Sequence, residues 1–182
     1  MERAEFERQA LEHLDAVHSV ACWIVRSRAD ADDIVQETYL RAFQAIDGFR
    51  GEAIKPWLLT ITRNLAYTFL TRRRRVANVI PFDEAVSRGG DGTPVPMQFP
   101  TDEPSAEARL VGEAEAESVR RALEALPLPL RETVVLREME ELSYQQIADV
   151  IDVPIGTVMS RLSRARAQLR RLLADEEGRH AV

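Results

Sequence analysis

The stretch from Ser143 to Leu173, SYQQIADVIDVPIGTVMSRLSRARAQLRRLL, reads as two helices joined by a tight turn. Ser143 and Gln146 have the spacing of a capping box, which gives the first helix a defined start. The apolar pattern breaks at 152–153, and Pro154 fits the first turn of a second helix, where its missing N–H costs nothing. The stretch therefore predicts a helical hairpin with a sharp turn.

The second helix of this hairpin carries two separate stripes. The apolar stripe contains Val158, Leu162, Ala165, Leu169 and Leu172. The polar stripe contains Thr157, Ser160, Arg161, Arg164, Gln168 and Arg171. At about 100° per residue, the stripe centres lie roughly a third of a turn apart, so one stripe can pack while the other faces outward.

Between Val153 and Ala174 there are five arginines and no acidic residue. This composition is typical of a helix-turn-helix whose second helix enters the DNA major groove, with arginine reading guanine edges and serine holding phosphates. A helical hairpin in a bundle, with a solvated basic face, is the alternative that this segment leaves open.

The distribution of charge limits how such a chain can use DNA. The 182 residues allow one ordinary domain or two small ones, and the net charge is −6. Residues 1–75 carry a net +1, residues 76–118 a net −7, and residues 119–182 a net charge of zero. The summed field repels phosphate, so we expect weak DNA binding by the chain alone and a need for a partner or a change of state.

The sequence favours neither an enzyme nor a membrane protein. It has no apolar run of membrane length and no signal-peptide pattern, and its one cysteine, Cys22, fits a reducing cytoplasm without disulfides. His18 lies four residues before Cys22 and could pair with it on a metal, but a buried thiol beside an ordinary histidine is the simpler reading. His13 and His180 stand apart, and no metal cluster, phosphate-binding loop or nucleophile–base pair is evident, so we expect no cofactor and no catalysis.

Two amphipathic helices are predicted at the N-terminus. The first has a buried stripe of Phe6, Ala10, Leu14, Val17, Ala21 and Ile24. The second begins near Asp30, because carboxylates complement a helix N-terminus, and turns inward Val35, Tyr39, Ala42, Phe43 and Ile46. Its outer face carries Asp32, Asp33, Gln36, Glu37 and Arg41. By itself, this face is compatible with simple solvation.

A third helix is predicted from Pro56 to about Arg73, closed by arginines at 72–75. Its apolar face has Leu58, Ile61, Leu65 and Phe69, and its polar face has Thr60, Arg63, Asn64, Tyr67 and Thr71. Amide, hydroxyl, aromatic and arginine groups together suit single-stranded or distorted DNA. A basic helix end favoured by the helix dipole is the alternative.

A linker separates this part from the helix-turn-helix. From Val76 to about Pro104 the pattern stops, and three glycines, five prolines and many acids predict a flexible or extended segment. A helix then ends at Pro127, and another starts at Pro129 and packs beneath the helix-turn-helix. With no strand signal, the fold class is all-α, with two small helical domains joined by an acidic linker.

Two motifs in this order carry a resemblance: the Asp-rich helix 30–43 followed by Trp57–Leu65, and Leu126-Pro127 followed by Pro154–Leu162. Together they resemble the extracytoplasmic-function sigma factors, the minimal two-domain class of the bacterial sigma-70 family. The resemblance implies region 2 over 1–75, a linker over 76–112, region 4 over 113–175 and a tail over 176–182.

The resemblance implies three binding faces. Core RNA polymerase would bind through its beta-prime clamp coiled coil to Asp32, Asp33, Gln36, Glu37 and Arg41, and through its beta flap to region 4. The minus-10 promoter element would be read by Arg63, Asn64, Tyr67, Thr71, Arg72 and Arg73, with Asn64 helping to hold the strand as one base is flipped. The minus-35 element would be read by Thr157, Ser160, Arg161, Arg164, Gln168 and Arg171.

Other expectations follow from the same resemblance. Trp57 is expected to pack the domain rather than touch DNA, an anti-sigma factor is expected as a further partner, and the linker carboxylates are hypothesised to mimic nucleic acid. Met159 and Ser163 depart from the residues common in relatives, which leaves the minus-35 sequence unassigned. A self-sufficient helix-turn-helix regulator with symmetric half-sites is the rival hypothesis, and an adaptor without a DNA role is a second.

Overall fold

The computed structural model describes residues 3–49, 53–79 and 106–180, and every regular element within these ranges is helical. This confirms the all-α prediction. Residues 80–105, which form most of the predicted linker, lie outside the described residues. The helices adjoining that gap reach Val79 on one side and start at Ala106 on the other, so both ends of the predicted linker are helical.

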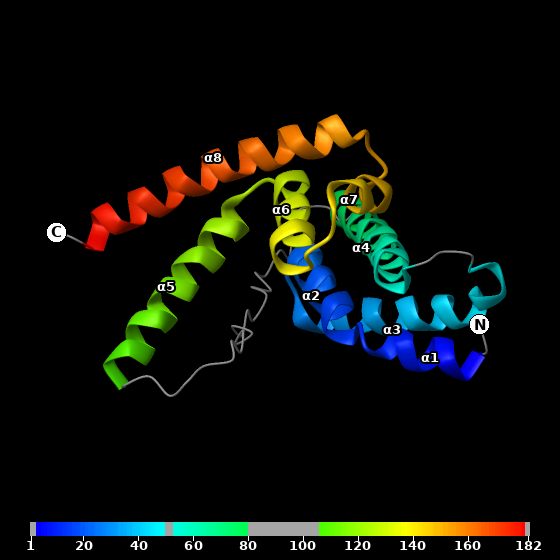
Figure 1. The fold of residues 1–182 in the computed structure, drawn as a ribbon. Helices are drawn as coiled ribbons and strands as arrows, with labels where there is room; N and C mark the ends of the chain where they lie inside the picture. The colour runs from blue at the N-terminus through cyan, green and yellow to red at the C-terminus, as the bar shows by residue number, and fades with distance from the viewer. Residues whose placement is uncertain (1–2, 50–52, 80–105, 181–182) are drawn as a thin grey trace.

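The N-terminal unit is a bundle in which α2, α3 and α4 pack against one another and α1 lies against α4 (Figure 1). Its elements are α1 (Arg3–Leu11), α2 (Leu14–Val25), α3 (Arg28–Gln44), the short 3-10 turn η1 (Ile46–Gly48) and α4 (Ile54–Val79). Apolar residues at helical spacing fill the centre, among them Val17, Leu58 and Leu59, which are fully buried. The bundle therefore follows from the periodicity of the sequence.

The predicted first helix is two helices in the structure. The helical pattern is interrupted at His13, which has φ −103° and ψ 14°. The interruption lets α1 pack against α4, and it brings Phe6 into an aromatic cluster with Phe49 and Trp57, with ring centroids 5.5 and 5.8 Å away. Leu14, expected in the core, is instead exposed just after the break. Trp57 packs within the unit, as predicted.

Local hydrogen bonds set the ends and the packing of α3. The Ser27 hydroxyl accepts a 3.3 Å bond from the Asp30 N–H and so caps the helix. Further along, the Tyr39 hydroxyl donates a 2.9 Å bond to the Ala10 carbonyl oxygen. This bond ties α3 to α1.

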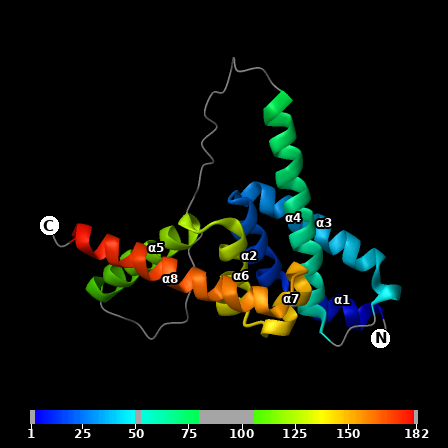
Figure 2. The same ribbon diagram turned by 90° about the horizontal axis from the view of Figure 1, so that it is seen from above.

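Helix α4 is longer than predicted, because it continues past Arg73 to Val79. Seen from above, its C-terminal half projects away from the rest of the molecule (Figure 2). The four arginines at 72–75 lie on this projecting part and are exposed. The projection leaves them accessible to a ligand.

The C-terminal unit contains the predicted helix-turn-helix. Its elements are α5 (Ala106–Ala125), α6 (Leu128–Val134), the π-helical turn η2 (Val135–Met139), α7 (Tyr144–Ile151) and α8 (Ile155–His180). The capping box of Ser143 and Gln146 is present in both directions. Asp152 ends α7 in the left-handed conformation, with φ 53°, and this residue makes the turn. The residues of the predicted apolar stripe at Val158, Leu162 and Ala165 are buried.

One detail of this unit differs from the prediction. The helix expected from Pro129 changes to a π-helical turn at Val135, and Glu140 closes this turn with an N–H bond to the Val135 carbonyl.

The two units pack against each other in the structure. Helix α6 lies against α2, and α7 lies against α4, while α5 and α8 extend together to the opposite side (Figures 1 and 2). Periodicity within single helices carries no information on how the units pack against each other. This packing decides which of the candidate DNA-contacting side chains are exposed.

Candidate nucleic-acid interface

The polar stripe of α8 is mostly available to solvent. Ser160, Arg164 and Arg171 are exposed, and Thr157 and Gln168 are half-buried. The guanidinium of Arg164 bends back along its own helix, with its Nε donating a 3.3 Å bond to the Ser160 carbonyl and its Nη2 lying 3.4 Å from the Ser160 hydroxyl. These contacts are local and exposed, so the arginine can exchange them for a DNA base or phosphate.

The polar face of α4 divides into two parts. Asn64, Thr71, Arg72 and Arg73 are exposed. Arg73 Nη1 lies 3.4 Å from the Asp30 carboxylate of α3 in an exposed ion pair. Arg63 and Tyr67, by contrast, turn toward the C-terminal unit.

One carboxylate of α6 binds donors from both candidate DNA-contacting helices. Glu132 Oε2 accepts a 2.8 Å bond from the Tyr67 hydroxyl and a 3.3 Å bond from Arg63 Nε. Glu132 Oε1 accepts a 3.4 Å bond from Arg161 Nη1 of α8. We call Glu132, Arg63, Tyr67 and Arg161 the Glu132 cluster.

The Glu132 cluster is largely withdrawn from water. The Glu132 side chain is 2% exposed, and those of Arg63 and Arg161 are 18% and 20% exposed. The Arg63 guanidinium also lies over the Tyr67 ring, with its carbon 4.4 Å from the ring centroid. A buried carboxylate needs such partners, because an unpaired charge away from water is strongly unfavourable.

Burial and the Glu132 carboxylate raise the pKa of the Tyr67 phenol well above its ordinary value. The phenol therefore stays protonated at neutral pH and acts as the donor to Glu132. The cluster combines two guanidinium groups with one carboxylate, so it keeps a positive surplus. Such a surplus suits a second anion, such as a phosphate.

Arg63, Tyr67 and Arg161 were predicted to lie on polar, outward faces, and the structure places them in this largely buried cluster instead. The periodicity was right about which side of the helix they occupy. Periodicity could not indicate that Glu132, which lies on another helix, covers that side.

Other polar contacts also lie at the boundary between the two units. Arg131 Nε donates a 2.9 Å bond to the Trp23 carbonyl of α2, and its Nη1 donates to the carbonyls of Glu124 at 3.0 Å and Leu126 at 3.3 Å. Burial lowers the pKa of the Arg131 guanidinium, although arginine remains charged in proteins. Arg26 of the N-terminal unit donates a 2.9 Å bond to the Glu124 carbonyl.

These residues were not among the sequence-based candidates. The signal that marks them is the charged pair at 131–132 inside the apolar run from Leu128 to Leu136. A charged pair at core positions of a helix indicates a buried polar contact with another element. The sequence does not reveal which element supplies the partner.

The outer face of α3 is the third candidate surface. Asp32, Asp33, Gln36 and Arg41 are exposed, and Glu37 is half-buried and pairs with Arg41 at 2.7 Å. His18 of α2 reaches this face, with its Nε2 3.1 Å from Asp32 Oδ1. The face is open in the same arrangement in which the Glu132 cluster is closed.

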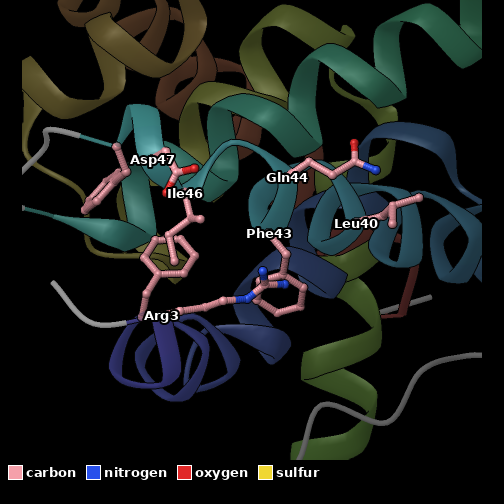
Figure 3. Close-up of a pocket in the computed structure, with 8 residues that line it drawn as sticks. Arg3, Leu40, Phe43, Gln44, Ile46 and Asp47 are labelled. Atoms are coloured by element: carbon pink, nitrogen blue, oxygen red, sulfur yellow. The ribbon is translucent and has the colours of Figure 1, made fainter.

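A groove of about 660 Å³ adjoins this surface near the end of α3 (Figure 3). Its lining residues are Arg3, Phe6, Leu40, Phe43, Gln44, Ile46, Asp47 and Phe49. Leu40 is 53% exposed and adds apolar surface to the groove. The groove gives the charged face of α3 an apolar neighbour.

Cys22 and His18 lie close together, with Sγ 3.7 Å from Nε2, and burial raises the pKa of the thiol. Within residues 3–49, 53–79 and 106–180 no three His, Cys, Asp or Glu side chains are placed to hold a metal ion. The helices described in those ranges also include none that is long and apolar enough to cross a membrane.

Family models match both units. The model "Sigma-70 region 2" matches residues 10–76, and "Sigma-70, region 4" matches residues 116–169. The chain is 36% identical over 154 residues to the ECF RNA polymerase sigma-E factor of Salmonella typhimurium, covering 82% of this chain and 78% of that protein. It is 32% identical over 163 residues to the ECF RNA polymerase sigma factor SigE of Mycolicibacterium smegmatis, covering 90% of this chain but 59% of that relative.

Solved structures give the same comparison at the level of the fold. The sigma factor RpoE of Bartonella quintana, solved in complex with the anti-sigma factor NepR, superimposes with a TM-score of 0.70 at 29% identity, covering 93% of this chain and 97% of that one. CnrH, solved in complex with the cytosolic domain of CnrY, has a TM-score of 0.62 at 23% identity over 96% of this chain and 90% of its own. At that identity, the likeness to CnrH concerns the fold alone.

Proposed function

Because this chain belongs to the extracytoplasmic-function group of RNA polymerase sigma factors, we propose that it docks on core RNA polymerase in the cytoplasm and carries the enzyme to specific promoters. The family consists of transcription initiation factors, so the polymerase supplies the catalysis. The observation that carries the proposal is the pair of matched regions in their order, each built around a helix with exposed arginines.

The outer face of α3 is the proposed polymerase-docking face. Its exposed carboxylates, Asp32 and Asp33, would pair with basic groups of the beta-prime clamp coiled coil and steer docking. Gln36, Glu37 and Arg41 continue the face along the helix, and Leu40 lies in the same stripe beside the groove. A charged rim beside an apolar spot is the usual composition of a protein–protein interface. The C-terminal unit would take a second position, on the beta flap.

The proposed promoter contacts lie on two helices. Helix α4 would hold the melted minus-10 strand through Asn64, Thr71, Arg72 and Arg73, with Arg63 and Tyr67 joining when free. Helix α8 would read the minus-35 element through Thr157, Ser160, Arg161, Arg164, Gln168 and Arg171. Each good bidentate base contact gives about 1–3 kcal/mol of discrimination, so two weak readers need to be mounted on one polymerase to act together.

We also propose control by an anti-sigma factor. The support is the likeness to RpoE of Bartonella quintana, which was solved with such a partner and is covered over nearly its whole length. Copurification of a small partner with the tagged chain from its own host would test this part separately.

The test of the main proposal is transcription in vitro with purified core polymerase over a promoter library, with and without the chain. We expect a defined subset of promoters to fire only when the chain is present. Specific binding of the free chain to a symmetric duplex site, with no promoter-dependent transcription, would instead favour the stand-alone regulator.

A further inference from the structure

We propose that Glu132 of the C-terminal unit is an internal substitute for nucleic acid, which engages Arg63 and Tyr67 of the N-terminal unit in the free chain and releases them once the polymerase has separated the units. The inference rests on the DNA-binding roles proposed above for α4 and α8. It adds a regulatory contact within the chain itself, independent of any inhibitor protein.

The geometry of the Glu132 cluster is the first argument. Arg63 and Tyr67 come from the proposed minus-10 helix, and Arg161 comes from the proposed minus-35 helix. All three donate to the two oxygens of one carboxylate. A carboxylate and a phosphate offer arginine the same kind of acceptor, so the donors that hold Glu132 are those that would hold DNA.

Burial is the second argument. With a 2% exposed carboxylate at the centre, a DNA strand cannot reach Arg63 or Tyr67 unless α6 moves away from α4. DNA and Glu132 therefore compete for the same donors. The apparent affinity of the free chain for DNA is the affinity of the open form multiplied by the fraction of molecules that are open.

The contact between the units contains several polar ties that can be exchanged. Its hydrogen bonds join side chains to carboxylates and carbonyls: Glu132 to α4, Arg131 to Trp23, Arg26 to Glu124, and Lys55 to Glu140. Apolar packing also spans the boundary, because buried residues of both units belong to one hydrophobic cluster, so opening has to be driven by binding to the polymerase. Each group can exchange its partner for water once the units separate.

The order of events follows from what remains open. In this closed arrangement Asp32, Asp33 and Gln36 are exposed on α3, so polymerase can dock before the Glu132 cluster opens. If the two units then bind separate positions on the polymerase, the enzyme favours the open chain by its differential affinity. Promoter binding is thereby restricted to the assembled holoenzyme.

The test compares three variants of the full chain. Glu132→Gln removes the central charge. Lys55→Gln weakens a second polar contact between the units, the one with Glu140, and Lys55 belongs to none of the proposed DNA-contacting sets. Glu138→Gln is the matched control, because it makes the same charge change on the same unit but breaks only the exposed pair with Arg166 within that unit.

The first readout is fluorescence anisotropy of a labelled single-stranded oligonucleotide with the free chain. The second is the radius of gyration from small-angle X-ray scattering, with circular dichroism reporting helix content. We expect Glu132→Gln to raise DNA affinity about tenfold and to expand the chain, since a charge-assisted hydrogen bond is worth at least about one factor of ten. Lys55→Gln should change both readouts in the same direction despite losing a positive charge, and Glu138→Gln should match the wild type.

Unchanged affinity and dimensions in a folded Glu132→Gln chain would overturn the inference. If that variant loses helix content, Lys55→Gln decides, and wild-type behaviour there overturns it as well. The proposed function is judged separately by transcription with core polymerase, so opened variants that never support transcription would refute the function and leave the internal contact standing.

Discussion

Lys55 holds Glu140 at two points: its Nζ lies 3.0 Å from the Glu140 carboxylate and donates a 2.9 Å hydrogen bond to the Glu140 carbonyl oxygen. The lysine opens α4 in one unit, and the glutamate closes the π-helical turn in the other. The Glu140 side chain is 7% exposed, so its charge depends on this partner. The contact therefore couples the end of an irregular turn to the alignment of the units.

We expect Glu140→Ala to lower the free energy of unfolding by about 2 kcal/mol, the scale for losing a hydrogen-bonded charge away from water. Urea denaturation followed by circular dichroism measures it. Glu138→Ala serves as the control and should cost less than about 1 kcal/mol, because its pair with Arg166 is exposed. Equal losses in the two variants would show that burial of Glu140 does not matter.

The left-handed residue Glu141 gives a second stability prediction. It has φ 56° and an exposed side chain, and a glutamate gains nothing from that conformation. Glu141→Gly should raise the free energy of unfolding by roughly 0.5–1 kcal/mol. Asp152→Gly, at φ 53°, should give a smaller gain because aspartate tolerates the left-handed region better. The reverse order of the two gains, measured in urea, would contradict this account.

The outer face of α3 gives a binding prediction. Reversing two exposed carboxylates, Asp32→Lys with Asp33→Lys, should reduce recovery of core polymerase in a pull-down about tenfold or more, because repulsion replaces steering at the contact. Glu12→Lys with Asp15→Lys makes the same change in charge on another exposed surface and should leave recovery near the wild-type level. Equal recovery with both double variants would remove α3 from the docking face.

Arg164 gives a promoter prediction. Arg164→Ala should weaken transcription from a cognate promoter about tenfold or more, the effect of losing one good base contact. Arg170→Ala removes the same charge from the same helix but outside the polar stripe, and it should have a much smaller effect. The measurement is in vitro transcription at fixed salt, because charge effects depend on ionic strength. Similar losses for both arginines would reduce Arg164 to a general electrostatic role.

Tyr39 gives a pH dependence. Burial raises the pKa of its phenol from 10.0 to about 12. Between these values the unfolded chain has released the proton and the folded chain has kept it, so stability falls as pH rises from 10 toward 12. Tyr39→Phe should flatten that part of the urea-stability profile, although it also loses the bond to the Ala10 carbonyl. Tyr144→Phe is the control, and a profile that stays as steep in Tyr39→Phe as in this control would contradict the assignment.

Much of the fold could be predicted from the sequence, because the responsible forces act within one helix. The Ser143 capping box, the turn before Pro154 and the buried stripe from Val158 to Ala165 are all local patterns. The break at His13 escaped prediction, since the apolar spacing continues across it and only the packing of α1 on α4 makes the break favourable.

The residue types of the candidate site could be predicted from the sequence, but whether its side chains are exposed or covered could not. Helical periodicity separates one side of α4 or α8 from the other, so it identified the side that bears Arg63 and Arg161. Whether that side faces water depends on α6, some seventy residues away from Arg63, and no pattern within α4 encodes that contact. The assignments of these residues to promoter elements stay predictions.

Arg131 reaches across the boundary between the units by donating to the main-chain oxygen of Trp23, and it binds two further main-chain oxygens, those of Glu124 and Leu126, within its own unit. Every residue type possesses a carbonyl, so substitutions at those three positions need not be matched by a change at 131. Pairwise covariation in related sequences would therefore be silent about this tie, while the carboxylate next door, whose partners are side chains, would leave a trace. Evolutionary coupling would consequently identify the side-chain contacts of Glu132 and would miss the main-chain contact of Arg131 with Trp23.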